Sequence, residues 1–142
     1  MSDCLFCKIG AREVEADILQ AGDDVVAFRD INPQAPTHVL IIPKDHLTSI
    51  DEITAGHGDL LADIVRTAAH VASAEGIAQS GWRLVTNVGP DAGQSVPHLH
   101  FHVVPRRPKD GLRGFFWPRR RYETPEEMAA VADQLRQALQ SP

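Results

Sequence analysis

Residues 97–104, with the sequence PHLHFHVV, alternate histidine with apolar residues. Successive side chains of a β-strand point to opposite faces, so the pattern predicts a strand from His98 to Val104. His98, His100 and His102 then share one face, and the intervening leucine, phenylalanine and valine share the other. A chain with this segment must bury one face of the strand in a core and use the other face for three aligned imidazoles.

Other strands are indicated by short apolar runs bounded by turn residues. The segments ILQA and VVAF within residues 17–28 flank a Gly-Asp-Asp turn and predict a hairpin. The run HVLII at residues 38–42 is nearly all apolar and is closed by Pro43, which predicts a central strand. Residues 82–87, WRLVTN, alternate as a further strand.

Two helices are indicated by apolar spacing and by capping residues. Residues 59–75 carry apolar side chains at helical spacing, and Gly76 follows where a C-terminal cap belongs. Thr124, Pro125 and Glu127 form the start of a second helix, whose apolar face contains Met128, Val131, Leu135 and Leu139. We therefore predict an α+β fold, with a mainly antiparallel five-stranded sheet, one long helix and a C-terminal helix, the helices covering one face.

Length and composition place these elements in a single globular unit. The chain has 142 residues, of which 43% are hydrophobic, enough for one sizeable core. No segment approaches the roughly 20 apolar residues of a membrane helix. The first residues, MSDCLFCK, resemble no secretory signal, so we expect a cytoplasmic protein without a membrane partner.

Charge is spread unevenly over the chain. The net charge is −5, yet residues 105–122 carry seven basic residues against one acidic residue, a local charge of +6. Such a segment either attracts phosphate or a polyanion, or is a solvated charged loop. Because the rest of the chain is acidic, we do not expect nucleic acid as the main partner.

Three aligned imidazoles permit two kinds of chemistry. They can bind a metal ion, or one can act as a nucleophile while its neighbours orient it. The preceding loop, residues 88–96, contains Gly89, Gly93, Gln94 and Ser95, which offer backbone N–H groups and short polar side chains. A loop of this kind is often a plain turn, but beside the histidines it suggests phosphate recognition. Separately, Cys4-x-x-Cys7 indicates metal binding or redox chemistry.

Residues 93–104, GQSVPHLHFHVV, resemble the signature of the histidine triad family of nucleotide hydrolases and transferases. Residues 28–38, FRDINPQAPTH, and 42–46, IPKDH, are similar in order and spacing to the Hint branch of that family. The resemblance spans about residues 3–118, which we expect to form the histidine triad domain. Residues 119–142 then form a C-terminal basic arm and helix, packed on or extending that domain. Trp117-Pro118 is similar to the Trp-Pro pair near the end of Hint proteins.

The resemblance implies a reaction and its catalytic residues. His100 would attack the α-phosphorus of a purine nucleotide and form a covalent nucleotidyl-histidine, which water then hydrolyses. His102 would contact the phosphate, and His38 would support His100, although a structural role at the start of a strand is an equal alternative. Imidazole suits this chemistry because it is largely neutral at pH 7.

The resemblance also implies the binding residues. Asp30 would bind the ribose hydroxyls. The phosphate oxygens or the leaving group would be held by Asn87, Gly93, Gln94 and Ser95. The base would lie in an apolar pocket of Leu5, Phe6, Ile9, Phe28 and Ile31.

A structural zinc ion is implied by the same resemblance, with Cys4, Cys7, His46 and His98 as ligands. Four nitrogen and sulfur ligands close a tetrahedral site and leave no position open for catalysis. His98 would then be committed to the metal, and His100 and His102 would remain for phosphate. No organic cofactor is expected, and the default assembly is a homodimer.

Three functions stay open from the sequence. The first is a histidine triad hydrolase of the phosphoramidase or dinucleoside polyphosphate hydrolase type, because Pro97 and residues 104–106 resemble the second branch. The second is a nucleotide sensor or scaffold with negligible turnover, which contacts a partner through the basic arm. The third is a metalloenzyme in which all three histidines bind a catalytic metal.

Overall fold

The computed structural model describes residues 3–33, 37–111 and 121–140. The chain forms two compact units, residues 1–108 and 109–142. The predicted Trp117-Pro118 ending, the boundary at residue 118 and part of the basic segment lie outside the described residues. Among those that are described, no helix is both long and apolar enough to cross a membrane.

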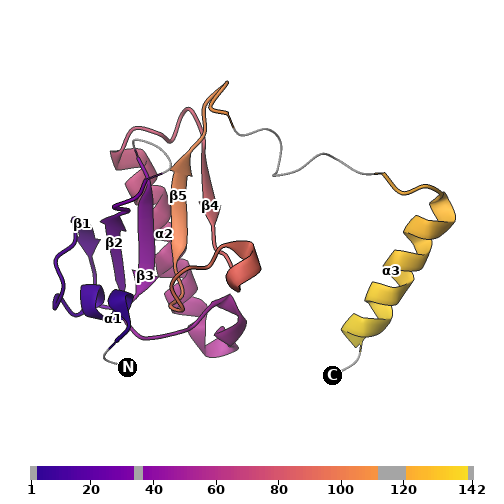
Figure 1. Cartoon of the computed structure of the whole chain (residues 1–142), viewed down its shortest axis with the longest axis horizontal. Helices are drawn as coiled ribbons and strands as arrows, with labels where there is room; N and C mark the ends of the chain where they lie inside the picture. Colours follow the sequence, from indigo (N-terminus) through magenta and orange to yellow (C-terminus); the bar gives the residue numbers. More distant parts are fainter. Residues whose placement is uncertain (1–2, 34–36, 112–120, 141–142) are drawn as a thin grey trace. The chain divides into compact units, whose positions relative to one another are not determined.

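The first unit is built on an antiparallel five-stranded sheet with the order β1-β2-β3-β5-β4 (Figure 1). The strands are β1 (Ile18–Ala21), β2 (Val25–Arg29), β3 (Val39–Pro43), β4 (Trp82–Val85) and β5 (Phe101–Pro105). The apolar run that predicted a central strand is indeed the middle strand, β3. The predicted α+β class with a five-stranded antiparallel sheet is therefore confirmed.

The long helix α2 (Gly58–Ala74) covers one face of the sheet (Figure 1). Its apolar face, which includes Ile64 and Ala68, packs on alternate residues of the strands. The helix ends as predicted, because Gly76 follows in the left-handed region with φ +76°. Three short 3-10 helices, η1 (Ile50–Glu52), η2 (Ala55–His57) and η3 (Pro90–Ala92), lie in the connections.

The short helix α1 (Leu5–Gly10) packs against the other face and was not predicted from the sequence. Phe6 and Ile9 of this helix are buried with Val26, Phe28 and Leu40 of the sheet. The helix has only six residues, too few to show an apolar period. Its position matters for function, because it brings Cys4 and Cys7 to the histidine face of the sheet.

The segment with alternating histidines is only partly a strand. β5 begins at Phe101, so of the three histidines only His102 lies within the strand, whereas the sequence predicted a strand from His98. The Leu99 N–H donates to the Leu47 carbonyl at 2.6 Å and thus leaves the sheet ladder. The alternation nevertheless persists, because Leu99, Phe101 and Val103 are buried on the α2 side.

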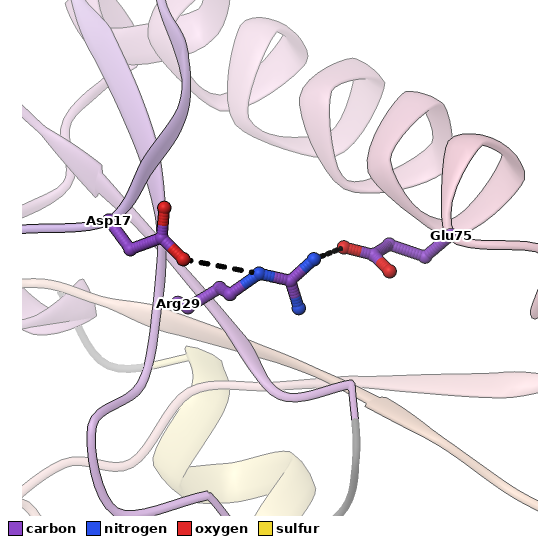
Figure 2. Close-up of polar contacts among 3 residues, drawn as sticks. All are labelled: Asp17, Arg29 and Glu75. Atoms are coloured by element: carbon purple, nitrogen blue, oxygen red, sulfur yellow. Dashed lines mark hydrogen bonds and ion pairs between the residues drawn. The ribbon is translucent and has the colours of Figure 1, made fainter.

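Strand β2 is fixed at its end by an ion-pair network on Arg29 (Figure 2). The guanidinium contacts Glu75, just after α2, at 2.6 Å and Asp17, just before β1, at 3.4 Å. Arg29 therefore ties the sheet to α2 immediately before Asp30. No feature of the local sequence predicts this pairing, because Glu75 is 46 residues away.

The second unit contains α3 (Pro125–Gln140). Its start follows the predicted cap, since the Glu127 N–H donates to the Thr124 hydroxyl at 3.1 Å. The Glu127 carboxylate accepts from the Glu123 N–H at 2.8 Å. The predicted C-terminal helix is therefore confirmed.

Candidate active site and metal centre

Four predicted metal ligands converge at the end of α1. Potential ligand atoms of Cys4, Cys7, His46 and His98 all lie within 4.8 Å of one another. The His46 and His98 Nδ1 atoms are 3.2 Å apart, and the His98 Nδ1 atom is 3.3 Å from Cys4 Sγ and 3.5 Å from Cys7 Sγ. The first turn of α1 places the two cysteines on one side, because residues three apart share a helix face.

These separations fit one tetrahedral zinc ion. Zn–N and Zn–S bonds of about 2.05 and 2.3 Å place two nitrogens about 3.3 Å apart and a nitrogen and a sulfur about 3.6 Å apart. The His98 Nε2–H donates to the Pro43 carbonyl at 2.8 Å, which leaves Nδ1 unprotonated and aimed at the cysteines. Burial and the neighbouring Cys4 thiol raise the pKa of Cys7, an effect that a cation here would oppose. The donor set therefore suits zinc.

The position of His100 is fixed through the backbone of His98. His100 is 5% exposed, and its Nδ1–H donates to the His98 carbonyl at 2.7 Å. A carbonyl oxygen only accepts, so this bond fixes the tautomer and leaves Nε2 with a free lone pair. The His100 carbonyl in turn accepts from the Thr86 hydroxyl at 2.9 Å. In the neutral imidazole the proton therefore sits on Nδ1, and Nε2 is the nitrogen available as a nucleophile.

Beyond His100 lies a second polar cluster. The His100 and His102 ring centroids are 5.1 Å apart, and His102 Nδ1 is 2.9 Å from His38 Nε2. His38 is 4% exposed, and its Nε2 is 3.6 Å from a carboxylate oxygen of Asp30. The other oxygen of Asp30 accepts from the Asn32 N–H at 2.8 Å. The structure therefore brings Asp30, His38, His100 and His102 together, with His38 in contact with His102.

The ring nitrogens of the three triad histidines do not converge on one metal position. His98 belongs to the cysteine group, whereas His102 groups with His38 and Asp30. A single metal ion held by all three histidines, the third possibility from the sequence, has no support in this geometry.

The environment favours neutral imidazoles. Burial lowers the pKa of His102 to about 4, helped by the neighbouring His100 and His38 and opposed by Asp30. Burial also lowers the pKa of His38, against the pull of Asp30. The pKa of His98 falls for the same main reason, although its hydrogen bond to Pro43 works in the other direction.

The low pKa of His102 predicts a pH-dependent stability. An unfolded histidine binds a proton below about pH 6.5, while folded His102 does so only below about 4, so stability falls as the pH drops through this window. Between pH 7.5 and 5, we expect His102 to account for a loss on the order of 1 to 2 kcal/mol, after allowance for its partial exposure. Urea unfolding at both pH values should give a smaller loss for His102→Gln than for the parent protein. Equal losses in the two proteins would contradict the prediction.

The residues predicted to bind the base fall into two groups. Phe6, Ile9 and Phe28 are buried in the core beneath the histidines, whereas Leu5 and Ile31 are 45% and 87% exposed. The Phe6 ring lies edge-on to His100, with centroids 5.1 Å apart. Phe6, Ile9 and Phe28 therefore belong to the core, and a base-binding role for exposed Leu5 and Ile31 stays a prediction.

In the loop before the histidines, one of the predicted phosphate-binding side chains is bound to the protein backbone instead. Gly93 and Ser95 are exposed, and Asn87 is half-buried close to Thr86, which contacts the His100 carbonyl. The amide of Gln94, by contrast, is engaged in hydrogen bonds to the backbone. Sequence reasoning did not reveal this role, because it depends on contact with Thr48, 46 residues away.

An open cavity of about 430 Å³ lies away from this site, between the β1–β2 turn and α2. Its lining carries three carboxylates, Asp23, Asp24 and Asp63, against one guanidinium, Arg66, so its net charge disfavours a phosphate group. None of the predicted site residues lines it.

Comparison with known proteins agrees with the fold. Residues 11–109 match the family model of the HIT domain. The purine nucleoside phosphoramidase of Escherichia coli K12 is 43% identical over 106 residues, covering 75% of this chain and 89% of the relative. The 14 kDa zinc-binding protein of Brassica juncea is 41% identical over 118 residues, covering 82% and 98%.

Similarity extends to solved structures. A HIT family hydrolase from Clostridium thermocellum superimposes with a TM-score of 0.73 at 45% identity, covering 77% of this chain and 95% of that one. The family match spans most of the chain, and both sequence and fold relatives agree with it. The chain therefore belongs to the HIT domain family.

Proposed function

We propose that the protein hydrolyses purine nucleotides at the α-phosphorus, with His100 as the nucleophile. The observation that carries the proposal is the hydrogen bond from His100 Nδ1–H to the His98 carbonyl, which leaves Nε2 free to attack. The similarity to a purine nucleoside phosphoramidase supports a nucleoside phosphoramidate as the substrate. A dinucleoside polyphosphate is the second substrate class to test.

The proposed reaction has two displacements. His100 Nε2 forms a bond to the α-phosphorus, and the bond from phosphorus to the amine or phosphate leaving group breaks as that group takes up a proton from solvent. Water then attacks the same phosphorus and gives up a proton to solvent. The bond between phosphorus and Nε2 breaks, which releases the nucleoside monophosphate and returns the electron pair to Nε2. The first step leaves His100 positively charged, and the His98 carbonyl stabilises this charge through the Nδ1–H bond.

The other residues have supporting roles in this proposal. His102 contacts the phosphate as a neutral imidazole, and His38 orients His102 through the 2.9 Å contact between their rings. The Asp30 carboxylate can still accept ribose hydroxyls, because two oxygens offer about four acceptor positions. Leu5 and Ile31 are exposed and available to the base, with Phe6, Ile9 and Phe28 beneath them. The Gly93 N–H donates to the Pro90 carbonyl at 3.0 Å, so the donors assigned to the phosphate oxygens are those of exposed Ser95 and the amide of Asn87. Gly93 itself shapes the loop next to them.

Zinc has a structural role in the proposal. Cys4, Cys7, His46 and His98 hold it, and as a closed four-ligand centre it stabilises the join between α1, the segment after β3 and the triad. Relatives named as zinc-binding proteins support this assignment. The homodimer and the cytoplasmic location stay predictions from the sequence.

The direct test is intact-protein mass spectrometry after rapid quenching without acid. We expect adenosine 5′-phosphoramidate to add one adenylyl group to the protein and to release AMP, and His100→Ala to show neither. Diadenosine tetraphosphate in parallel samples ranks the two substrate classes. An adduct that persists in His100→Ala would contradict the role of His100. Nucleotide binding without adduct or AMP would instead favour the sensor or scaffold.

A further inference from the structure

The Gln94 side chain joins three segments of the backbone. Its Nε2 group donates to the Thr48 carbonyl at 2.7 Å and to the Val96 carbonyl at 3.1 Å. Its Oε1 atom accepts from the Gly89 N–H at 3.0 Å. The orientation of the amide is fixed, because a flipped amide would place its oxygen against two carbonyl oxygens.

The backbone of Gln94 is also engaged, since its N–H donates to the Gly89 carbonyl at 3.0 Å. Both side-chain hydrogens of Gln94 are therefore used, and presenting them to a phosphate would break the bonds to Thr48 and Val96. The bond to Val96 is partly buried and the bond to Thr48 is exposed, so releasing both donors costs two hydrogen bonds, of which the first is the more expensive. This argues against the direct phosphate contact that the sequence suggested for Gln94.

The three residues that the Gln94 side chain binds lie close in sequence to the triad or to a predicted zinc ligand. Gly89 begins the loop, Val96 ends it just before the triad, and Thr48 lies two residues after the predicted zinc ligand His46. The segment after His46 also binds the triad directly through the backbone, because the Leu47 carbonyl accepts from the Leu99 N–H at 2.6 Å. One glutamine thus links the two ends of the glycine-rich loop to the segment that follows His46.

We propose that Gln94 is a positioning residue, which sets the glycine-rich loop in its phosphate-binding shape before nucleotide arrives. The inference rests on the proposed function, because the loop is there assigned to the α-phosphate. Fixed donors stabilise a transition state without a cost of reorganisation at the moment of reaction. Gln94 therefore contributes to catalysis by fixing the loop that carries the adjacent Ser95, not by contact with the nucleotide.

The test compares Gln94→Met and Gln94→Glu with a control, Gln20→Met, on the exposed residue Gln20 of β1. Methionine removes all three side-chain bonds at similar length. Glutamate keeps an acceptor for the Gly89 N–H but sets a carboxylate against the Thr48 and Val96 carbonyls. Hydrogen exchange of residues 86–96 is measured in the nucleotide-free proteins, together with AMP affinity and kcat/KM.

We expect both variants to speed exchange in this loop at least about 10-fold, while exchange in α2 and the control stay unchanged. The kcat/KM value should fall about 100-fold, as for a misplaced catalytic group, with most of the loss in kcat. Unchanged exchange of the loop with weaker AMP binding would overturn the proposal in favour of a direct phosphate contact. Unchanged kcat/KM would also overturn it.

The exchange experiment separates this inference from the proposed function. If the parent protein neither binds AMP nor turns over substrate, the proposed function fails whatever the loop does, and the inference fails with it. If the parent protein is active and the loop of Gln94→Met exchanges normally, only the inference fails. Gln94→Glu provides the second variant should Gln94→Met unfold.

Discussion

His100→Ala is expected to lower kcat/KM for adenosine 5′-phosphoramidate by about 10⁴-fold or more, as is typical for the loss of a covalent nucleophile. In neutral His100 the lone pair available for attack is on Nε2, since Nδ1–H is bound to the His98 carbonyl. His102 Nδ1 and His38 Nε2 are engaged with each other at 2.9 Å, which fits supporting roles for these two rings. The measurement is the initial rate of AMP release over a range of substrate concentrations.

The matched control is His70→Ala, which removes an exposed histidine from α2. It should retain the parent rate. AMP affinity, measured by calorimetry, should stay within a few fold in His100→Ala, because His100 acts mainly in the transition state. Turnover of His100→Ala above a tenth of the parent rate would show that another group attacks the phosphorus.

Loss of the metal site is the second large effect. We expect the purified protein to contain about one zinc per chain, and Cys4→Ser or His46→Ala to lose most of it. A lost ligand should cost about 3 kcal/mol or more, which corresponds to a fall in Tm of about 10 °C for a chain of this size. The physical reason is that these four side chains bring α1, the segment after β3 and the triad together at one point.

The measurements are elemental analysis of zinc and thermal unfolding, and neither depends on activity. His70→Ala again serves as the control, because His46 and His70 are both exposed but only His46 groups with the cysteines. Equal zinc content in the His46→Ala and His70→Ala variants would refute the four-ligand assignment. We also expect zinc-depleted protein to lose activity, because His98 supplies the carbonyl that orients His100.

Local sequence patterns were sufficient for most of the fold. The hairpin of β1 and β2, the central strand β3, the helix α2 with Gly76 and the cap of α3 were all predicted from periodicity and capping residues. These signals depend on residues within a few positions of one another, so they can be recognised in the sequence alone. Helix α1 escaped because its six residues are stabilised by burial of Phe6 and Ile9 rather than by an intrinsic pattern.

For the candidate site, too, some features were predicted from the sequence and others were not. The alternation of residues 98–103 predicted that histidines and apolar residues face opposite sides, and the family resemblance named the zinc ligands and His100. The start of β5 was placed three residues too early, because the Leu99 N–H pairs with Leu47 outside the sheet. A hydrogen bond between backbone groups that are 52 residues apart cannot be recognised from the local sequence.

What the sequence determined by itself is therefore the chemistry available, namely three alternating histidines, a Cys-x-x-Cys pair and a glycine-rich loop on an α+β fold. Only the tertiary structure decided how each group is used. It assigned the His98 Nε2–H to Pro43, the His100 Nδ1–H to His98 and the Gln94 amide to Thr48, Val96 and Gly89. The physical reason is that residue types fix which hydrogen bonds are possible, whereas the direction of each bond depends on contacts between distant segments.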